Sequence, residues 1–364
     1  MKKIFYITAL LLSVISIGLI SCDKDNSDPD LDPVNKESTI KFSEYGILEM
    51  SFINANEGWL FVSVNGGYQE YKLLHSTDGF QNYSIVSETC PRFRKIKFID
   101  SNNGIGISWD GADRNFYTTD GGVTWQNFIG DGDGDITYNS TYFVMPYTYE
   151  ESDFLMRIGA CFYNKSDFQF HHKTTFSTPK AELFGGSSGS DQHYSSVHLS
   201  ENGALSFTGV YMQDDVIFDV NSSFTAYCSN ETTLSTSLLA NTKKSPERTE
   251  FPTDEVGYFS LADDSNLYKT IDKGETWNAV YTFDDPGSYI KISFADENNG
   301  AVLNGTQLFL TNDGGQTFHE SAVIDEDYDV AGEIDYVDRN NIYLSVLSLT
   351  GGSYFEQLLI KIGD

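Results

Sequence analysis

A recurring octapeptide constrains the fold of this chain more than any other sequence feature. Its pattern is Ser/Thr-x-Asp-x-Gly-x-Thr-aromatic, and the most divergent copy carries Phe80 where the others have glycine. The copies are Ser76–Tyr83, Thr118–Trp125, Thr270–Trp277 and Thr311–Phe318. The aspartate can accept backbone N–H bonds two residues on, glycine supplies the positive φ of a tight hairpin, and the aromatic ring packs behind the turn. We therefore interpret each copy as a structural hairpin turn. The residues assigned to these turns are Asp78, Asp120, Gly122, Trp125, Asp272, Gly274, Trp277, Asp313, Gly315 and Phe318.

A second element, aromatic-x-Asp/Asn-x-x-x-Gly-apolar, lies upstream of each octapeptide. It begins at Phe52, Phe98, Phe251 and Phe294, and a decayed copy begins at Tyr336. The first two copies are 46 residues apart, and the last three follow at intervals of 43 and 42 residues. The 153 residues between the second and third copies fit three longer units. Seven units are therefore expected, two of which lack the octapeptide. Their starts are expected near the residues Phe143 and Val197.

A period of 40–50 residues with four short strands per unit is typical of a β-propeller. The abundance of Tyr, Phe and Gly also favours an all-β chain. We expect a seven-bladed β-propeller with four-stranded antiparallel blades. A six-bladed ring, with part of residues 130–250 as an insertion, is the alternative. In the second unit the strands are expected at about 94–98, 103–108, 114–118 and 124–129.

The final unit, residues 333–362, contains only three expected strands. Residues 38–46 could supply the missing fourth strand. Such a closure would hide the two sheet edges that an open ring exposes.

The octapeptide resembles the Asp-box, or BNR repeat, of sialidase-like β-propellers. Residues 45–362 are similar to the single-domain propellers that include the photosystem II assembly factor family. The resemblance implies a propeller fold and ligands on the face opposite the Asp-boxes. Sialidases of this family also need three arginines, one of them in an Arg-Ile-Pro motif before the first Asp-box. Here no arginine precedes Asp78, and Met156-Arg157-Ile-Gly159 lacks the proline. Sialidase activity is therefore not expected.

The amino-terminal segment carries targeting signals. Lys2-Lys3 precedes an apolar run, and Leu19-Ile-Ser-Cys22 resembles the lipobox of bacterial lipoproteins. The resemblance implies a signal peptide over 1–21 and a lipidated Cys22. Residues 22–38 are expected to be an acidic, disordered tether, and residues 39–364 a single propeller domain. The acidic stretch resembles the surface-export signal of Bacteroidetes lipoproteins, which implies the outer face of the outer membrane. The periplasmic face is the alternative.

Charge and cysteine content exclude some classes of function. The chain has 53 acidic and 23 basic residues and a net charge of −30, which argues against nucleic acid as a partner. Beyond Cys22 the cysteines are Cys90, Cys161 and Cys228, so at most one bridge can form among them. Their pairing is left open, and a monomer is expected.

The candidate ligand site centres on Trp109, because the repeat accounts for every other tryptophan. Trp109 lies in a polar loop with Asp110 and Arg114, and Tyr68 of the neighbouring blade is a second aromatic candidate. An aromatic residue flanked by charges suits sugar stacking or a protein hot spot.

Metal sites are not expected. The acidic loop Gly130–Asp135 departs from a calcium-binding EF-hand, because Ile136 and Tyr142 stand where oxygen ligands or glycine are needed. The side chains of His171 and His172 would point to opposite faces of a strand. No catalytic residue, metal ligand or cofactor is assigned.

The sequence favours a surface-anchored, non-catalytic propeller that binds a glycan or an envelope protein on the face opposite the Asp-boxes. The alternative is a glycoside hydrolase or lyase whose carboxylate pair the sequence does not identify. Two acids about 5–10 Å apart at the channel mouth, one with a raised pKa, would favour the enzyme.

Overall fold

The computed structural model divides the chain into two compact units, residues 1–32 and 33–364. All described residues belong to the second unit. They are 37–42, 45–64, 70–109, 115–127, 136–152, 155–179, 190–213, 220–229, 235–238, 246–261, 264–284, 290–305, 307–323, 328–348 and 356–362.

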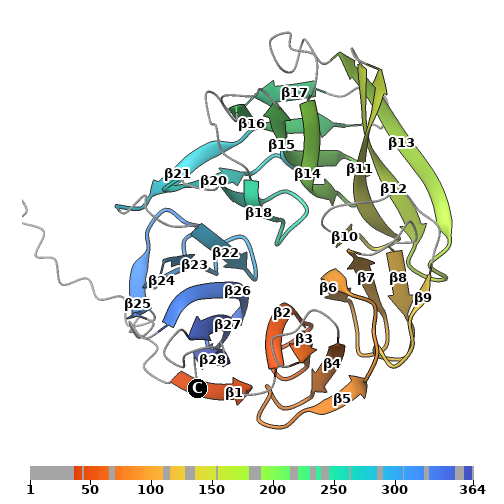
Figure 1. Ribbon diagram of the computed structural model, residues 1–364. Coiled ribbons are helices and arrows are strands. Elements are labelled where there is room, and N and C mark those ends of the chain that lie inside the picture. Colours follow the sequence, from red (N-terminus) through yellow and green to blue (C-terminus); the bar gives the residue numbers. More distant parts are fainter. Residues whose placement is uncertain are drawn as a thin grey trace, which may run out of the picture. The chain divides into compact units, whose positions relative to one another are not determined.

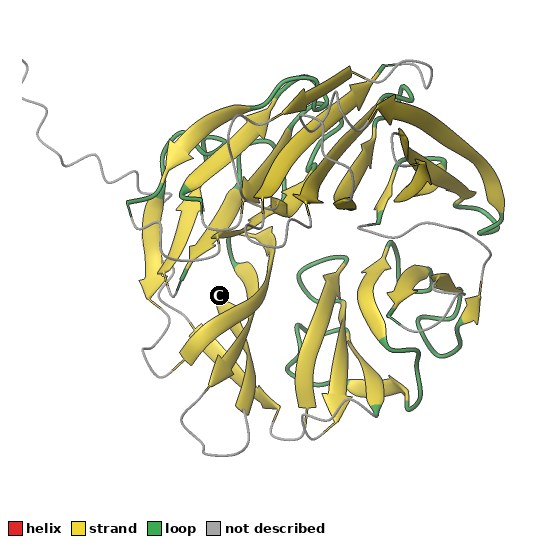
Figure 2. Cartoon of the chain, turned by 45° about the horizontal axis from the view of Figure 1, so that its top comes forward, coloured by secondary structure: helices red, strands yellow, loops and turns green. Residues whose placement is uncertain are grey.

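The second unit is a ring of seven four-stranded antiparallel sheets (Figure 1). Its described residues form strands and loops without a helix (Figure 2). Accordingly, none of the described segments is a helix long and apolar enough to cross a bilayer. The prediction of an all-β, seven-bladed β-propeller is confirmed, and the six-bladed alternative is wrong.

The blades are numbered 1 to 7 along the chain, and each begins with the strand nearest the ring centre. Blades 1 to 4 comprise β2(Tyr45–Phe52), β3(Gly58–Val64), β4(Tyr71–Ser76), β5(Ser84–Ser87); β6(Phe93–Phe98), β7(Gly104–Ser108), β8(Asn115–Thr118), β9(Gln126–Asn127); β10(Thr137–Tyr138), β11(Tyr142–Ser152), β12(Leu155–Asn164), β13(Phe170–Pro179); and β14(Ser190–Leu199), β15(Leu205–Gln213), β16(Val220–Cys228), β17(Ser235–Leu238). Blades 5 to 7 comprise β18(Pro246–Glu250), β19(Gly257–Leu261), β20(Asn266–Thr270), β21(Asn278–Thr282); β22(Ile290–Phe294), β23(Gly300–Asn304), β24(Gln307–Thr311), β25(His319–Val323); and β26(Tyr328–Asp338), β27(Asn341–Ser348), β28(Glu356–Ile362), β1(Glu37–Phe42).

Blade 7 is completed by the first strand of the unit. β1 pairs antiparallel with β28, from Glu37 opposite Ile362 to Phe42 opposite Gln357. The predicted closure by the amino-terminal strand is therefore confirmed, and β28 lies inside the sheet of blade 7 with β1 as its outermost strand.

The strand predictions hold for blade 2 but not for the start of blade 3. Phe143, the expected start of blade 3, lies on the second strand β11, and the innermost strand is the two-residue β10. The apolar run at Phe143 suggested an inner strand, but in this blade the second strand is the longest one. Val197 lies on the innermost strand β14, as predicted.

Packing explains why an aromatic residue and a glycine recur together in the second sequence element. A Cβ added to Gly104 would lie 2.8 Å from the Phe98 ring, and one added to Gly257 would lie 2.6 Å from the Phe251 ring. Real Cβ atoms do not approach so closely. The glycine is therefore required because the ring of the first strand lies directly on the backbone of the second.

Each octapeptide turn is held by its hydroxyl and its carboxylate together. In blade 2, the Thr118 Oγ1 accepts a hydrogen bond from Gly122 N (2.9 Å) and donates one to Asp120 Oδ1 (2.8 Å). Asp120 then accepts from Thr124 N (2.9 Å) and from Thr124 Oγ1 (2.6 Å). The expectation that the aspartate accepts N–H bonds two residues on is wrong. It reaches four residues on, because the threonine hydroxyl already takes the nearer N–H groups.

The divergent copy in blade 1 keeps this geometry with different side chains. Asn82 donates from its backbone N (2.9 Å) and from its side-chain amide (2.8 Å) to Asp78. Phe80 adopts the positive φ of the missing glycine, at 63°, while its ring is buried against Phe52. Burial of the ring offsets the backbone cost that a non-glycine residue meets there.

Aromatic rings also join neighbouring blades. Trp59 of blade 1 stacks on Phe98 of blade 2 at 3.9 Å, and its Nε1 donates to Gly121 O (2.9 Å). Tyr343 of blade 7 stacks on Phe52 of blade 1 at 3.9 Å. Stacked pairs of this kind add about 0.5–1.5 kcal/mol beyond the area they bury. The ring is therefore closed by a side-chain contact as well as by β1.

Candidate functional site

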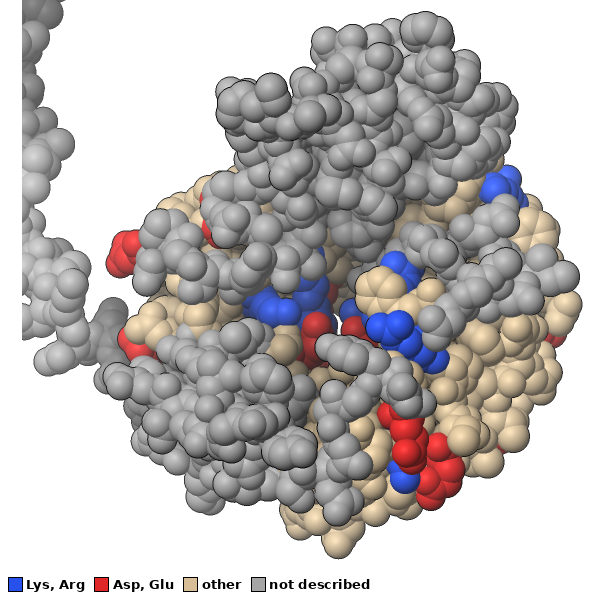
Figure 3. Space-filling view, viewed as in Figure 1, with Lys and Arg blue, Asp and Glu red and all other residues tan. Residues whose placement is uncertain are grey.

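The innermost strands place charged side chains in the centre of the ring. Along a strand, alternate residues point to the same side, so Lys95 and Lys97 of β6 face the channel together. The same spacing recurs in two other blades. The charged residues that line this cavity are Lys95, Lys97, Arg248, Glu250, Glu333 and Asp335. The cavity measures about 390 Å³. Figure 3 shows basic and acidic side chains gathered at the centre of the ring.

Arg248 is the hub of the ion pairs in this channel. Its Nη2 lies 2.7 Å from Glu250 Oε1, and its Nη1 lies 3.1 Å from Glu333 Oε2. Lys291 Nζ approaches Glu333 at 3.9 Å from the adjacent blade. Arg248 Nη1 also donates to Ile334 O (2.9 Å). One guanidinium thus connects the innermost strands of blades 5 and 7 across blade 6.

Two of the channel carboxylates also bind backbone groups of the next blade. Glu250 Oε2 accepts from Phe294 N (2.8 Å), and Asp335 Oδ2 accepts from Phe52 N (3.3 Å). Ser51 and Ser293 make the equivalent bond elsewhere in the ring. The channel charges therefore fix the relative positions of adjacent blades.

The environment separates the acids of the channel into two kinds. Burial raises the pKa of Glu250 and of Asp335, and Arg248 and Lys97 only partly oppose it. Burial also raises the pKa of Glu333, but Lys95, Arg248 and Lys291 outweigh it and hold that pKa below its usual value. Glu250, whose pKa is raised, and Glu333, whose pKa is lowered, therefore both contact the Arg248 guanidinium.

Trp109 lies one strand out from the innermost strand of blade 2. It follows β7, and its backbone N donates to Arg92 O just before the innermost strand β6 (2.9 Å). Its side chain is 60% exposed, with the Arg94 guanidinium carbon 6.0 Å from the ring centroid. Because paired strands lie about 4.8 Å apart, the Trp109 backbone is one strand away from the chain that leads into β6.

Three of the predicted ligand residues cannot be placed. Tyr68, Asp110 and Arg114 lie outside the described residues, as does the lipidation candidate Cys22. The structure therefore places Trp109 directly after β7, and the ligand site around it stays a prediction.

The carboxylates of the octapeptide turns bind groups within their own turns. Burial raises the pKa of Asp120, but hydrogen bonds from Thr124 outweigh it, so the pKa lies below its usual value. The pKa values of Asp272 and Asp313 are lowered in the same way. The turn carboxylate in blade 1, Asp78, has its pKa lowered chiefly by hydrogen bonds from Asn82.

The described part of the chain shows how most of the histidines and cysteines are placed. It contains no group of three or more His, Cys, Asp or Glu residues placed to hold a metal ion. His172 stacks on Phe162 at 4.1 Å. No disulfide joins Cys90, Cys161 and Cys228 within the described residues, and burial raises the pKa of the Cys90 thiol to about 12.

The channel network was missed at the sequence level, although a signal was present. In three units the innermost strand carries charges two residues apart, as Lys95 and Lys97, Arg248 and Glu250, and Glu333 and Asp335. Such alternation beside buried apolar positions marks a strand with one polar face. A polar face on the innermost strand of a ring must line the channel.

Comparison with known proteins supports the fold and leaves the family undefined. No family model matches the chain, and no curated protein matches it. YCF48 bound to a D1 peptide is similar in structure, with 16% identity, a TM-score of 0.53 and coverage of 91% of this chain and 96% of that chain. YCF48 from Cyanidioschyzon merolae has 14% identity, a TM-score of 0.57 and coverage of 90% and 98%.

A third similar structure is virginiamycin B lyase from Staphylococcus aureus. It has 8% identity, a TM-score of 0.52 and coverage of 90% of this chain and 99% of that chain. The three structures include a peptide-binding protein and a lyase. At these identities the similarity establishes the β-propeller fold and does not define a function.

Proposed function

We propose that this propeller is a non-catalytic binding module that engages a protein partner at the channel mouth, on the face opposite the octapeptide turns. The observation that carries this proposal is the combination of Trp109, 60% exposed, with the Arg248 charge network in the channel. Exposed Trp and partly desolvated Arg are the residues most enriched in the energetic centres of protein interfaces. The peptide-bound state of YCF48, a similar propeller, supports the same partner class.

The channel acids favour binding over catalysis. A general acid must offer its proton to a substrate atom within hydrogen-bond reach. Both oxygens of Glu250 are already engaged, one by Arg248 and one by Phe294 N. Asp335 accepts from Phe52 N. A glycoside hydrolase or lyase remains the second candidate, because a raised and a lowered pKa occur together at Glu250 and Glu333.

The amino-terminal signals support anchoring of this module to the outer membrane, with the propeller facing outward. The lipobox Leu19-Ile-Ser-Cys22 makes Cys22 the proposed acylated residue. Cys22→Ala should release the protein from the membrane fraction of the producing cells. Retention of the variant in the outer membrane, at wild-type levels, would contradict the anchor.

The binding role is tested by affinity capture from envelope extracts with quantitative mass spectrometry. Wild-type protein should enrich at least one envelope protein that Trp109→Ala enriches at least about tenfold less, as expected for loss of an interface anchor. Phe170→Ala is the matched control, since Phe170 is an exposed aromatic residue (49%) on the outermost strand of blade 3. Enrichment that is independent of Trp109 would contradict the proposed site.

Catalysis is tested separately with Glu250→Gln and Glu333→Gln. The proposal expects wild-type protein to release no product from a panel of envelope polysaccharides. Turnover that either substitution abolishes would establish the enzyme instead.

A further inference from the structure

A second cavity, of about 550 Å³, opens between blades 2 and 3 on the rim that carries the octapeptide turns. Its lining comes from the first-to-second turn of blade 2 and from two turns of blade 3. The side chains that line it include Asp100, Asn103, Tyr138, Thr141, Asn164 and Lys165.

Two departures from the repeat coincide at this junction. In blade 2 the first-to-second turn closes with Ile99 N bonded to Asn103 O, whereas in blade 3 it closes one residue sooner, with Asn139 N bonded to Tyr142 O. Blade 2 also has Ile105 at the position that Trp59 occupies in blade 1, and the ring that reaches the next blade is instead Tyr117, which stacks on Phe168 at 4.6 Å. A shorter turn and a shorter side chain leave the rim hollow here.

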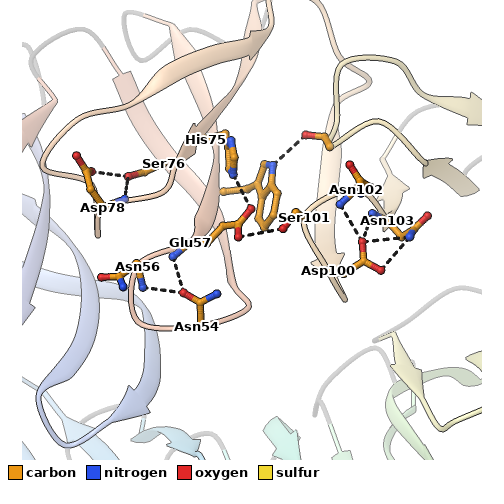
Figure 4. A network of polar contacts seen from close by, with 12 residues as sticks. Asn54, Asn56, Glu57, His75, Ser76, Asp78, Asp100, Ser101, Asn102 and Asn103 are labelled. Carbon is orange, nitrogen blue, oxygen red and sulfur yellow. Dashed lines mark hydrogen bonds and ion pairs between the residues drawn. The ribbon is translucent and has the colours of Figure 1, made fainter.

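The wall formed by blade 2 holds an oriented amide. Asp100 Oδ1 accepts from Asn102 N and Asn103 N (both 2.8 Å), and Asp100 Oδ2 accepts from Asn103 Nδ2 at 2.9 Å. Figure 4 shows this arrangement. The Asn103 side-chain oxygen makes no hydrogen bond to any described residue. It is a fixed acceptor to which no donor in the described part of the chain is bonded.

The wall formed by blade 3 adds an aromatic ring and further polar groups. Tyr138 is 38% exposed, and Lys165 Nζ lies 4.6 Å from its ring centroid while donating to Asn139 O (3.0 Å). Within the described part of the chain, the Thr141 hydroxyl and the Asn164 side-chain amide make no hydrogen bonds. Donors, acceptors and a partly open ring therefore face one cavity.

We propose that this cavity binds a neutral saccharide chain. The C–H face of a sugar ring packs on an aromatic side chain, and its hydroxyls both donate and accept, as the amides of Asn103 and Asn164 do. The opposite charges of Asp100 and Lys165 balance, which favours a neutral ligand over a charged one. The volume falls within the range of about 300–1,000 Å³ found for small-ligand sites. This saccharide site lies on the opposite rim from the channel mouth and does not depend on the proposed protein partner.

The test is isothermal titration of the full propeller with five neutral hexasaccharides: maltohexaose, cellohexaose, xylohexaose, mannohexaose and chitohexaose. At least one should bind with a Kd below about 10 mM, the weak end of measurable affinity. For that oligosaccharide, Tyr138→Ala and Asn164→Ala should each weaken binding at least about tenfold, as loss of a stacking platform or an amide pair predicts.

Two control variants distinguish binding in this cavity from binding at another surface of the propeller. Tyr83→Ala removes a tyrosine of similar exposure (44%) from blade 1 and should leave the affinity unchanged. Trp109→Ala should also leave it unchanged, so the saccharide site can fail while the channel-mouth site stands. Failure of all five oligosaccharides to bind would overturn the proposal. Binding that survives both Tyr138→Ala and Asn164→Ala, in variants with wild-type melting temperatures, would overturn it equally.

Discussion

Blades 2 and 3 are neighbours in the ring, yet they hold their hairpins in different ways. In blade 2 the strands β8 and β9 pair over only two positions, and Asp120 closes the turn between them. In blade 3 no octapeptide is present, and β12 and β13 pair over nine positions. The hairpin between them uses backbone bonds such as Phe168 N to Asn164 O (2.8 Å) and a single carboxylate bond from Gln169 N to Asp167 (3.0 Å).

A longer strand ladder can therefore replace the hydrogen bonds of a carboxylate turn in holding a hairpin. A hydrogen bond contributes a net 0.5–1.5 kcal/mol, so several added ladder bonds can offset a lost carboxylate turn. In blade 4, which also lacks the octapeptide, the equivalent strands β16 and β17 pair over only four positions, so the long ladder is a feature of blade 3. A blade can therefore lose its octapeptide without leaving the ring.

The largest effect is expected where an octapeptide glycine packs against a blade that lacks the octapeptide. Gly274 has φ of 89°, and a Cβ there would collide with Ser206 of blade 4. Gly203 in blade 4 has a similar φ of 88° but open space around it. Gly274→Ala should lower the free energy of unfolding by at least about 3 kcal/mol and Gly203→Ala by about 1 kcal/mol, measured by urea denaturation. Equal losses of stability in the two variants would show that backbone strain alone, and not the collision with Ser206, determines the cost.

The second largest effect is expected on removing the carboxylate from each kind of hairpin, because the two carboxylates should contribute differently to the free energy of unfolding. Asp120→Ala removes bonds to Thr118 and Thr124 and should cost about 1–3 kcal/mol of stability. Asp167→Ala removes one exposed bond and should cost less than about 1 kcal/mol. Binding by the folded variants should be unchanged. A loss of binding by Asp120→Ala at an unaltered melting temperature would make that residue functional.

A smaller difference in stability is expected between a tyrosine hydroxyl that bonds to a neighbouring blade and one that bonds within its own blade. The Tyr343 hydroxyl donates to Ala55 O of blade 1 (2.7 Å), and Tyr343→Phe should cost about 1 kcal/mol. The Tyr117 hydroxyl donates to the exposed Gln126 of its own blade (2.8 Å), and Tyr117→Phe should stay within about 0.5 kcal/mol of wild type. Thermal unfolding of the two single variants measures the difference.

The smallest effects are expected on acidification, and they should have opposite signs in the turns and in the channel. The pKa of Asp120 is lowered on folding, so its stabilisation is complete above the unfolded pKa of about 3.9 and is lost as pH falls through the folded value. The pKa of Glu250 is raised, so ionising it costs stability that is regained as pH falls. Relative to wild type, Asp120→Asn should lose less stability between pH 5 and pH 2, and Glu250→Gln should lose more. Parallel curves for the three proteins would contradict these assignments.

The sequence was sufficient for the blade count because the repeat carries a local mechanism in each copy. Phe98 and Gly104 must occur together because the ring lies on the glycine backbone. Their spacing can therefore be recognised in the sequence. Blade 3 hid its start because Phe143 stands where that glycine would be, opposite Tyr138. When the packing constraint is lost, the spacing signal is lost with it.

The channel site was harder to predict because its parts are far apart in the chain. Arg248 and Glu333 are 85 residues apart and meet only when the ring closes. Trp109 was identified as an exception to the repeat, and the structure places it directly after β7. The saccharide cavity depends on a turn shortened by one residue, which sequence alone does not relate to the opposite wall at Asp100.

The pairing of Glu37 with Ile362 also separates the order of blades from the order of the chain. Because the first and last strands of the ring are hydrogen-bonded neighbours, a short linker could join them, and the chain could be cut between β21 and β22 instead. Tolerance of such circular permutation is expected where termini adjoin and the new ends fall between compact elements. The ring would then keep the same neighbours with a different first blade, and the closing strand would lose its special status.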